Sequence, residues 1–241
     1  MPLLLPVLLG VLTLLGAGTA TADDRRAYSA NDTPWLAAVG KLQVPGTRYR
    51  EGRREYVIED CTATLVSRPG RARANTLVTA WHCLEAYDDL SRPIQFTLHP
   101  DSPQAISAEA FVLASGGSMQ ADWAVLRLRT RIASSDVQAL QVADSPDIDT
   151  PVMMAGYSKD TGLGAGGQRL TFDPHCRITT TGGAEGETDC MAFKGASGGP
   201  LLQADSQGGT LVYGIISAGD GQGLSTYIPV ADFRHALDRA L

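Results

Sequence analysis

The sequence predicts an all-β fold with one helix at the C-terminus. Glycine and proline account for 26 and 13 of the 241 residues, and short apolar runs recur between turn-forming residues. Frequent chain-breaking residues between short runs rich in Val, Leu and Thr are typical of many short strands joined by tight turns. The runs that we interpret as strands lie at 35–39, 63–66, 77–80, 123–128, 152–155 and 211–217.

These runs fall into two halves. The polar stretch 130–151 is the best candidate for the connection between two β units. In the first half, Val125 and Arg127 alternate with Leu126 and Leu128, a period of two that suits a half-buried strand. The segment 48–54 is rich in arginine but diluted by glutamate, so we interpret it as a solvated loop.

The helix is predicted at residues 230–241. Its apolar residues recur at i, i+3, i+7 and i+11, which places them on one stripe that can pack against the body of the protein. The four residues of this stripe are Val230, Phe233, Leu237 and Leu241.

Composition excludes several classes of protein. The apolar fraction is 44% and the charged fraction 19%, whereas disordered chains are apolar-poor and charge-rich. A coiled coil would need abundant Ala, Glu, Lys, Leu and Arg. The formal charge of −6 argues against a nucleic-acid partner, since such partners select basic surfaces.

Residues 1–22 are predicted to be a signal peptide. They carry no charge, run apolar from Leu3 to Leu15, and end in the small-x-small pattern Ala20-Thr21-Ala22 before Asp23. An apolar stretch of about 13 residues fits a secretory segment better than a bilayer span. No Lys or Arg precedes it, so a retained anchor is the alternative. We expect the chain from 23 to 241 to be secreted or periplasmic and to have no membrane contact after signal removal.

The chain has four cysteines, Cys61, Cys83, Cys176 and Cys190, which allow three disulfide pairings in an exported protein. None forms a CxxC pair, so a zinc site is poorly supported. The pairing local in sequence joins Cys61 to Cys83 and Cys176 to Cys190, although spacing alone does not decide it. We expect no metal and no cofactor.

Three short segments carry residues suited to nucleophilic catalysis: 78–83 with His82, 121–126 with Asp122, and 195–201 with Ser197. A serine hydroxyl becomes a good nucleophile when an imidazole removes its proton, and a carboxylate fixes the tautomer of that imidazole. Glycines beside the serine let backbone N–H groups approach a developing oxyanion. Each segment is a modest signal alone, but together they predict a serine hydrolase.

In these features the sequence resembles the chymotrypsin/trypsin-like serine peptidase family, specifically its bacterial secreted members. Beyond the three segments, Pro34-Trp35 opens the first predicted strand, Cys61 and Cys83 bracket the region of the His, and Tyr227 precedes the terminal helix, as in that family. The resemblance implies two six-stranded antiparallel β-barrels, at about 30–130 and 150–230, with the active site in the cleft between them.

The resemblance also implies a role for each residue of the site. His82 would be the general base, Asp122 its orienting carboxylate and Ser197 the nucleophile of a serine endopeptidase that forms an acyl-enzyme. The N–H groups of Gly195 and Ser197 would form the oxyanion hole. A protein or peptide substrate would add as a strand to one edge, and the chain would act as a monomer. That edge consists of Ser217, Ala218 and Gly219. The alternative is a catalytically silent module that binds peptides in the same cleft.

One departure from the family concerns activation. Activated members place an Asp immediately before the nucleophile, where it meets a newly cut N-terminal ammonium, but this chain has Ala196. We therefore expect activity without insertion of a new N-terminus, while the dibasic pair Arg25-Arg26 offers a trimming site.

The specificity pocket is expected to be uncharged. Met191 stands where tryptic members carry an acid, and Ile216 stands where glutamate-specific members carry a His. Ala192 and Ser225 complete the expected walls, so a small or medium apolar side chain is favoured. Asp220 would change this specificity if it pointed inward.

Two other motifs offer rival interpretations. Residues 195–199 also match the GxSxG elbow of α/β-hydrolases, with Asp220 and His235 following in the required order. That elbow must lead into a helix, and Pro200 followed by apolar residues favours a strand instead. Residues 162–167 match GxGxxG, but no βαβ pattern surrounds them, so we interpret them as a surface loop.

Overall fold

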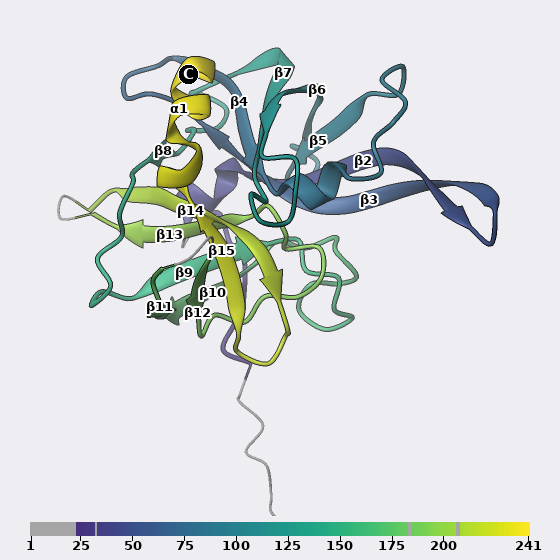
Figure 1. The fold of residues 1–241 in the computed structure, drawn as a ribbon. Helices are drawn as coiled ribbons and strands as arrows, with labels where there is room; N and C mark the ends of the chain where they lie inside the picture. Colours follow the sequence, from purple (N-terminus) through teal and green to yellow (C-terminus); the bar gives the residue numbers. More distant parts are fainter. Residues whose placement is uncertain (1–22, 32, 183–184, 206–207) are drawn as a thin grey trace, which may run out of the picture.

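The structure is a computed structural model that describes residues 23–31, 33–182, 185–205 and 208–241. The predicted signal peptide lies outside these residues. The all-β fold class is confirmed, since the described residues form two β units and one C-terminal α-helix (Figure 1).

The first unit is a closed antiparallel barrel with the strand order β2-β3-β4-β7-β6-β5. Large apolar side chains such as Leu65, Leu77 and Phe96 are fully buried in its interior. The strands are β2 (Val39–Arg50), β3 (Arg53–Val66), β4 (Arg73–Thr79), β5 (Ile94–Leu98), β6 (Ile106–Ser115) and β7 (Ala124–Ala133).

The second unit is a curled nine-stranded sheet with the order β1-β10-β9-β13-β14-β15-β12-β11, and β8 pairs with β14. A second six-stranded barrel was expected here, but within the described residues this sheet has nine strands and does not close on itself. The N-terminal segment adds β1 beside β10 at one edge, and the β11–β12 hairpin forms the other edge. The strands are β1 (Arg26–Ala27), β8 (Gln141–Val142), β9 (Val152–Gly156), β10 (Thr171–Cys176), β11 (Ile178–Thr180), β12 (Gly186–Thr188), β13 (Pro200–Ala204), β14 (Thr210–Gly219) and β15 (Ser225–Pro229).

Two local predictions in the first unit were wrong. Residues Pro34–Ala38 form a 3-10 helix (η1) rather than the start of a strand, because a proline at the first position favours a helical turn. The predicted loop at 48–54 is the exposed tip of the long β2–β3 hairpin, which projects from the barrel (Figure 1). Glu51 and Gly52 have φ values of 51° and 78°, the left-handed conformations that a two-residue hairpin turn requires.

The predicted terminal helix is α1 (Val230–Ala240), with Val230, Phe233 and Leu237 buried. It packs on β7 and β14. In β7, Val125 is fully buried like its neighbour Leu126, so the expected alternation of buried and exposed residues fails there. Among the described residues, no helix combines the length and apolar character that crossing a membrane requires.

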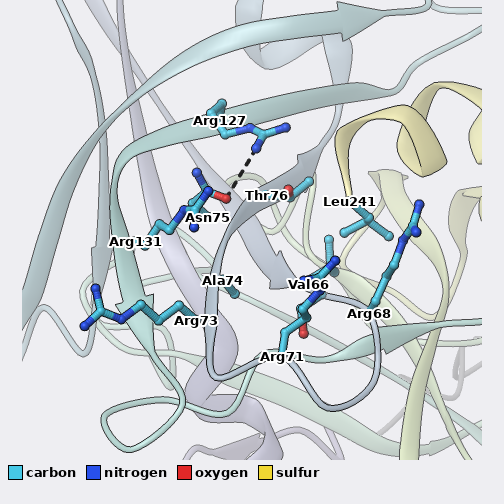
Figure 2. Close-up of a pocket in the computed structure, with 11 residues that line it drawn as sticks. Val66, Arg68, Arg71, Arg73, Ala74, Asn75, Thr76, Arg127, Arg131 and Leu241 are labelled. Carbon is cyan, nitrogen blue, oxygen red and sulfur yellow. Dashed lines mark hydrogen bonds between the residues drawn. The ribbon is translucent and has the colours of Figure 1, made fainter.

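Arginines at the barrel rim cap the C-terminal end of α1. Arg127 donates from Nη2 to the carbonyl of Ala240 at 2.7 Å, and the Thr76 hydroxyl donates to the same oxygen at 3.0 Å. Arg68 donates to the carbonyl of Asp238 at 2.9 Å. These side chains line a hollow of about 140 Å³. Arg127 also donates to Asn75, as Figure 2 shows. The last carbonyls of a helix lack internal partners and attract cations, so this rim holds the helix in place.

Candidate active site

Two paired strands of the barrel bring His82 and Asp122 together. His82 lies in the 3-10 helix η2 (Trp81–Leu84) just after β4, and Asp122 lies two residues before β7. Because Thr79 of β4 pairs with Ala124 of β7, the two side chains meet at one end of the barrel. His82 donates to the carboxylate from its backbone N to Oδ1 and from Nδ1 to Oδ2, both at 2.8 Å.

The Asp122 carboxylate is fully buried and accepts a third hydrogen bond, from the Ser217 hydroxyl to Oδ2 at 2.7 Å. Burial raises the pKa of Asp122, but the hydrogen bonds from His82 and Ser217 outweigh it, so this pKa lies below its usual value. An ionised carboxylate can only accept hydrogen bonds, so Nδ1 of His82 must carry the ring proton. In the neutral ring, Nε2 is therefore free to accept a proton.

Ser197 lies in the loop before β13, beside this pair. Its hydroxyl donates to the carbonyl of Ser217 at 3.5 Å, so Ser217 contacts both Asp122 and Ser197. The carbonyl of Ser197 lies 3.9 Å from the sulfur of Cys83, the residue after His82. Among the described residues, Ser197 Oγ makes no hydrogen bond to His82. Catalytic hydrogen bonds of this kind often shorten only when substrate binds.

The backbone around Ser197 carries two N–H groups of interest, those of Gly195 and of Ser197 itself. Gly195 has a φ of 96° and is packed against the carbonyl of Tyr157 and the side chain of Lys159, so a Cβ does not fit there. Within the described part of the chain, the N–H groups of Gly195 and Ser197 have no hydrogen-bond acceptor. This arrangement can stabilise an anionic oxygen that lies within hydrogen-bond distance of both donors.

Thr62 of β3 forms hydrogen bonds with the backbone of the loop that carries Ser197. The sequence alone did not single out this residue. Its hydroxyl donates to the carbonyl of Gly195 at 2.8 Å and accepts from the N–H of Tyr157 at 2.9 Å. Its own N–H donates to the carbonyl of Ser197 at 2.9 Å. Thr62 is fully buried and lies beside Cys61, but no local pattern marks a threonine as a partner of a loop 133 residues away.

The two disulfides join Cys61 to Cys83 and Cys176 to Cys190, which confirms the pairing local in sequence. Cys61, His82 and Cys83 form a close group of the residue types that bind metals. Both sulfurs of that group are committed to one disulfide, so they do not offer thiolates to an ion.

Three of the residues expected to form the specificity pocket surround a space with almost no free volume, although Met191 also lines a separate hollow of about 590 Å³ with Asp173 and Asp189. Met191, Ala192 and Ile216 are buried and line a cavity of about 10 Å³, which Arg25 and Ala196 also line. A space of this size holds at most about one water molecule.

The walls of the expected pocket are in contact. A Cβ on Gly219 would overlap the carbonyl of Ala192, and Gly221 donates its N–H to the same carbonyl at 3.1 Å. Ser225 is buried, and its hydroxyl donates to the carbonyl of Cys190 at 2.8 Å. Asp220 is exposed and accepts hydrogen bonds from backbone N–H groups of its own loop, so it does not point into the pocket.

The outer edge of β14 is unpaired beside Ser197. Strand β13 pairs with β14 only as far as Ile215, and Ile216 is bonded to the loop at Gly198 and Gly199. Within the described residues, the last three residues of β14 therefore pair with no strand on the side of the serine, where the Ser217 carbonyl accepts the Ser197 hydroxyl, while β15 occupies their other edge. These residues are Ser217, Ala218 and Gly219.

The structure disfavours both rival motifs. Ser197 leads into strand β13, which begins at Pro200, and not into the helix that an α/β-hydrolase elbow needs. His235 is exposed on α1 and bonded to Arg239. The glycine-rich residues 162–167 form turns after Asp160, with no helix following them.

Comparison with known families agrees with this geometry. The family model described as Trypsin matches residues 28–237. The chain belongs to the trypsin family. Its family-matched region contains the three segments around His82, Asp122 and Ser197, together with both disulfides.

Two solved structures share the fold of this trypsin-family chain. They are a thermostable serine protease, AL20, from an extremophilic microorganism and the protease Anisep from Arthrobacter nicotinovorans. Each has a TM-score of 0.60 and 18% identity and covers 85% of this chain, with 96% and 93% of the respective neighbour covered. No curated protein sequence matches the chain.

Proposed function

We propose that this chain is a serine endopeptidase that works through an acyl-enzyme. One observation carries the proposal: a set of hydrogen bonds joins His82 to Asp122, Asp122 to the Ser217 hydroxyl, and the Ser217 carbonyl to the hydroxyl of Ser197. It leaves Nε2 of His82 as the unprotonated ring nitrogen and two N–H donors unpaired beside the serine. Peptide-bond hydrolysis needs this combination of base, nucleophile and oxyanion donors.

The proposed reaction has two halves. Ser197 Oγ attacks the substrate carbonyl carbon while its proton passes to Nε2 of His82, and the resulting oxyanion accepts hydrogen bonds from the N–H groups of Gly195 and Ser197. The C–N bond then breaks, and the imidazolium gives its proton to the leaving amine. Water, deprotonated by the same imidazole, hydrolyses the ester and releases Ser197. Asp122 keeps its negative charge throughout and stabilises the imidazolium.

Labelling by a fluorophosphonate tests this function against the alternative of a silent peptide-binding module. We expect one adduct, on Ser197, and no adduct in His82→Ala, because the serine then lacks its base. The matched control is His235→Ala, an exposed histidine on α1, which should label like the parent. A folded protein that binds peptides but leaves Ser197 unlabelled would support the silent module and overturn the peptidase.

We further propose that the residue before the cleaved bond is small and uncharged. The contact between Gly219 and Ala192 leaves no room for a long side chain, and the described residues that line the nearly filled cavity behind it include no acidic residue. With matched peptides carrying Ala, Leu, Arg or Glu at that position, we expect kcat/KM for Ala to exceed that for Arg and Glu by more than about tenfold. A preference for Arg would contradict the proposal.

We also propose that the chain is exported and acts as a monomer. Two disulfides suit an oxidising compartment, and residues 1–22 carry the composition of a signal peptide. We expect the chain to accumulate outside the cytoplasm with its N-terminus at Asp23. N-terminal sequencing of the exported protein tests this expectation, and a chain that keeps residues 1–22 would contradict it.

A further inference from the structure

The N-terminal segment buries an arginine behind the loop that carries the serine. The Arg25 side chain is 2% exposed, although Asp24 and Arg26 on either side of it are exposed. The chain after Arg25 is held independently, since β1 pairs with Thr171 and Phe172 of β10. A buried guanidinium is unfavourable unless it is fully paired, so its partners indicate what it does.

Arg25 has three partners that surround its planar group. Nε and Nη2 donate to the two carboxylate oxygens of Asp23 at 2.9 and 2.7 Å, and Nη1 donates to Asp160 Oδ1 at 2.9 Å. Its Cζ also lies 4.0 Å from the ring centre of Phe193. Asp160 in turn accepts the N–H of Gly164 at 3.1 Å, so it closes the glycine-rich loop. This geometry uses the fork of an arginine, which a lysine does not have.

Two short routes connect Arg25 with the Gly195 peptide. The residue before Asp160, Lys159, donates its N–H to the carbonyl of Lys194 at 2.7 Å. That carbonyl belongs to the same peptide as the N–H of Gly195, so fixing one fixes the direction of the other. On the second route, Phe193 lies directly under the guanidinium, two residues before Gly195.

We propose that Arg25 is a positioning residue that holds the Lys194–Gly195 peptide with its N–H directed at the reacting carbonyl. The proposal rests on the proposed peptidase function and adds a role for the N-terminal segment. Arg25 and Ala196 line the same small cavity, so the position that carries no charge in this chain lies beside an internal guanidinium whose carboxylate partners are Asp23 and Asp160. Insertion of a newly cut N-terminus is then unnecessary.

The dibasic pair Arg25-Arg26 is then a site of inactivation. Cleavage after Arg25 or Arg26 would separate the Arg25 guanidinium from the rest of the chain and release the loop that carries Ser197. Proteolysis at this pair therefore lowers activity, the reverse of activation by cleavage. The chain that begins at Asp23 is the active form, and one that begins at Ala27 is impaired.

Substitution at position 25 tests the proposal in the chain that begins at Asp23. For Arg25→Met, which keeps most of the length but loses the charge and donors, we expect kcat to fall about 10- to 100-fold with KM within about threefold. The upper limit is set by the loss of one oxyanion donor, which lowers kcat about 10²- to 10³-fold. Arg25→Lys should recover only part of kcat, and ethylguanidinium added to Arg25→Ala should raise kcat severalfold. Arg26→Ala, an exposed neighbour in β1, should match the parent.

Amide hydrogen exchange gives a readout that does not need activity. Residues 193–198 should exchange faster in Arg25→Met than in the parent or in Arg26→Ala. If parent Ser197 fails to react with a fluorophosphonate, the peptidase function is wrong, and the exchange data still decide whether Arg25 holds the loop. Unchanged kcat and unchanged exchange in Arg25→Met would overturn the proposal. So would a chain beginning at Ala27 that is more active than one beginning at Asp23.

Discussion

Replacing Thr62 by valine removes one hydroxyl from behind the serine loop and almost nothing else. That hydroxyl donates to the carbonyl of Gly195 and accepts from the N–H of Tyr157, in a fully buried position. Valine has nearly the same shape, so both partners would be left buried without this bond. Each such group costs about 1–3 kcal/mol, so the two together amount to about 2–6 kcal/mol.

This free energy should divide between folding and catalysis. Loss of the hydrogen bond from the Tyr157 N–H lowers the free energy of unfolding. Loss of the hydrogen bond to the Gly195 carbonyl also loosens the loop that carries the proposed oxyanion donors. We expect the urea midpoint to fall and kcat on a peptide ester to fall about tenfold or more, since a factor of ten corresponds to about 1.4 kcal/mol in the barrier.

A neighbouring threonine provides a matched control. Thr64, also fully buried in β3, has a hydroxyl with no hydrogen-bond partner within the described ranges. Thr64→Val removes an unpaired polar group, so it should leave kcat unchanged and keep or raise the urea midpoint. If Thr62→Val behaved like Thr64→Val in both measurements, the reasoning that Thr62 supports the loop would be refuted.

Two further predictions concern pH and the terminal helix. The pKa of Asp122 is lower in the folded chain than in the unfolded chain, so the ionised carboxylate stabilises the fold fully above about pH 3.8, and this stabilisation is lost as the pH falls through the pKa of the folded state. The difference in unfolding free energy between the parent and Asp122→Asn should therefore become smaller below about pH 4. A difference that stays constant with pH would contradict this. Arg127→Ala removes the bond to the Ala240 carbonyl and should lower the free energy of unfolding by about 1–2 kcal/mol with kcat unchanged, whereas Arg71→Ala on the same rim should change it by less than about 0.5 kcal/mol. Equal losses in the two arginine variants would refute the capping role.

Local patterns predicted much of the fold. The apolar stripe of α1 follows from a helical period, and the strands β3, β4, β7, β9 and β14 coincide with short apolar runs between turn-forming residues, both of which a short window reveals. The 3-10 helix at Pro34–Ala38 was missed because an apolar run is compatible with both strand and helix. The segment 48–54 is exposed as predicted, but the strands that continue into it up to the turn at Glu51 and Gly52 were missed because its charged residues suggested a loop.

The candidate site was predictable only in part. His82, Asp122 and Ser197 stand in segments whose residue types suggest chemistry, and two of them meet because β4 pairs with β7. Arg25 and Thr62 carry no such signal. Each depends on a partner more than 130 residues away, and a single sequence does not encode that distance in any local pattern.

The acyl-enzyme is the central claim, and pre-steady-state kinetics test it most directly. With a p-nitrophenyl ester of a short peptide ending in Ala, mixed in milliseconds with the chain that begins at Asp23, we predict a burst of one p-nitrophenolate per chain. Acid quenching during the burst should trap the acyl group, and peptide mass analysis should place it on Ser197. A linear time course with no burst, or an acyl group on any other residue, would contradict the account.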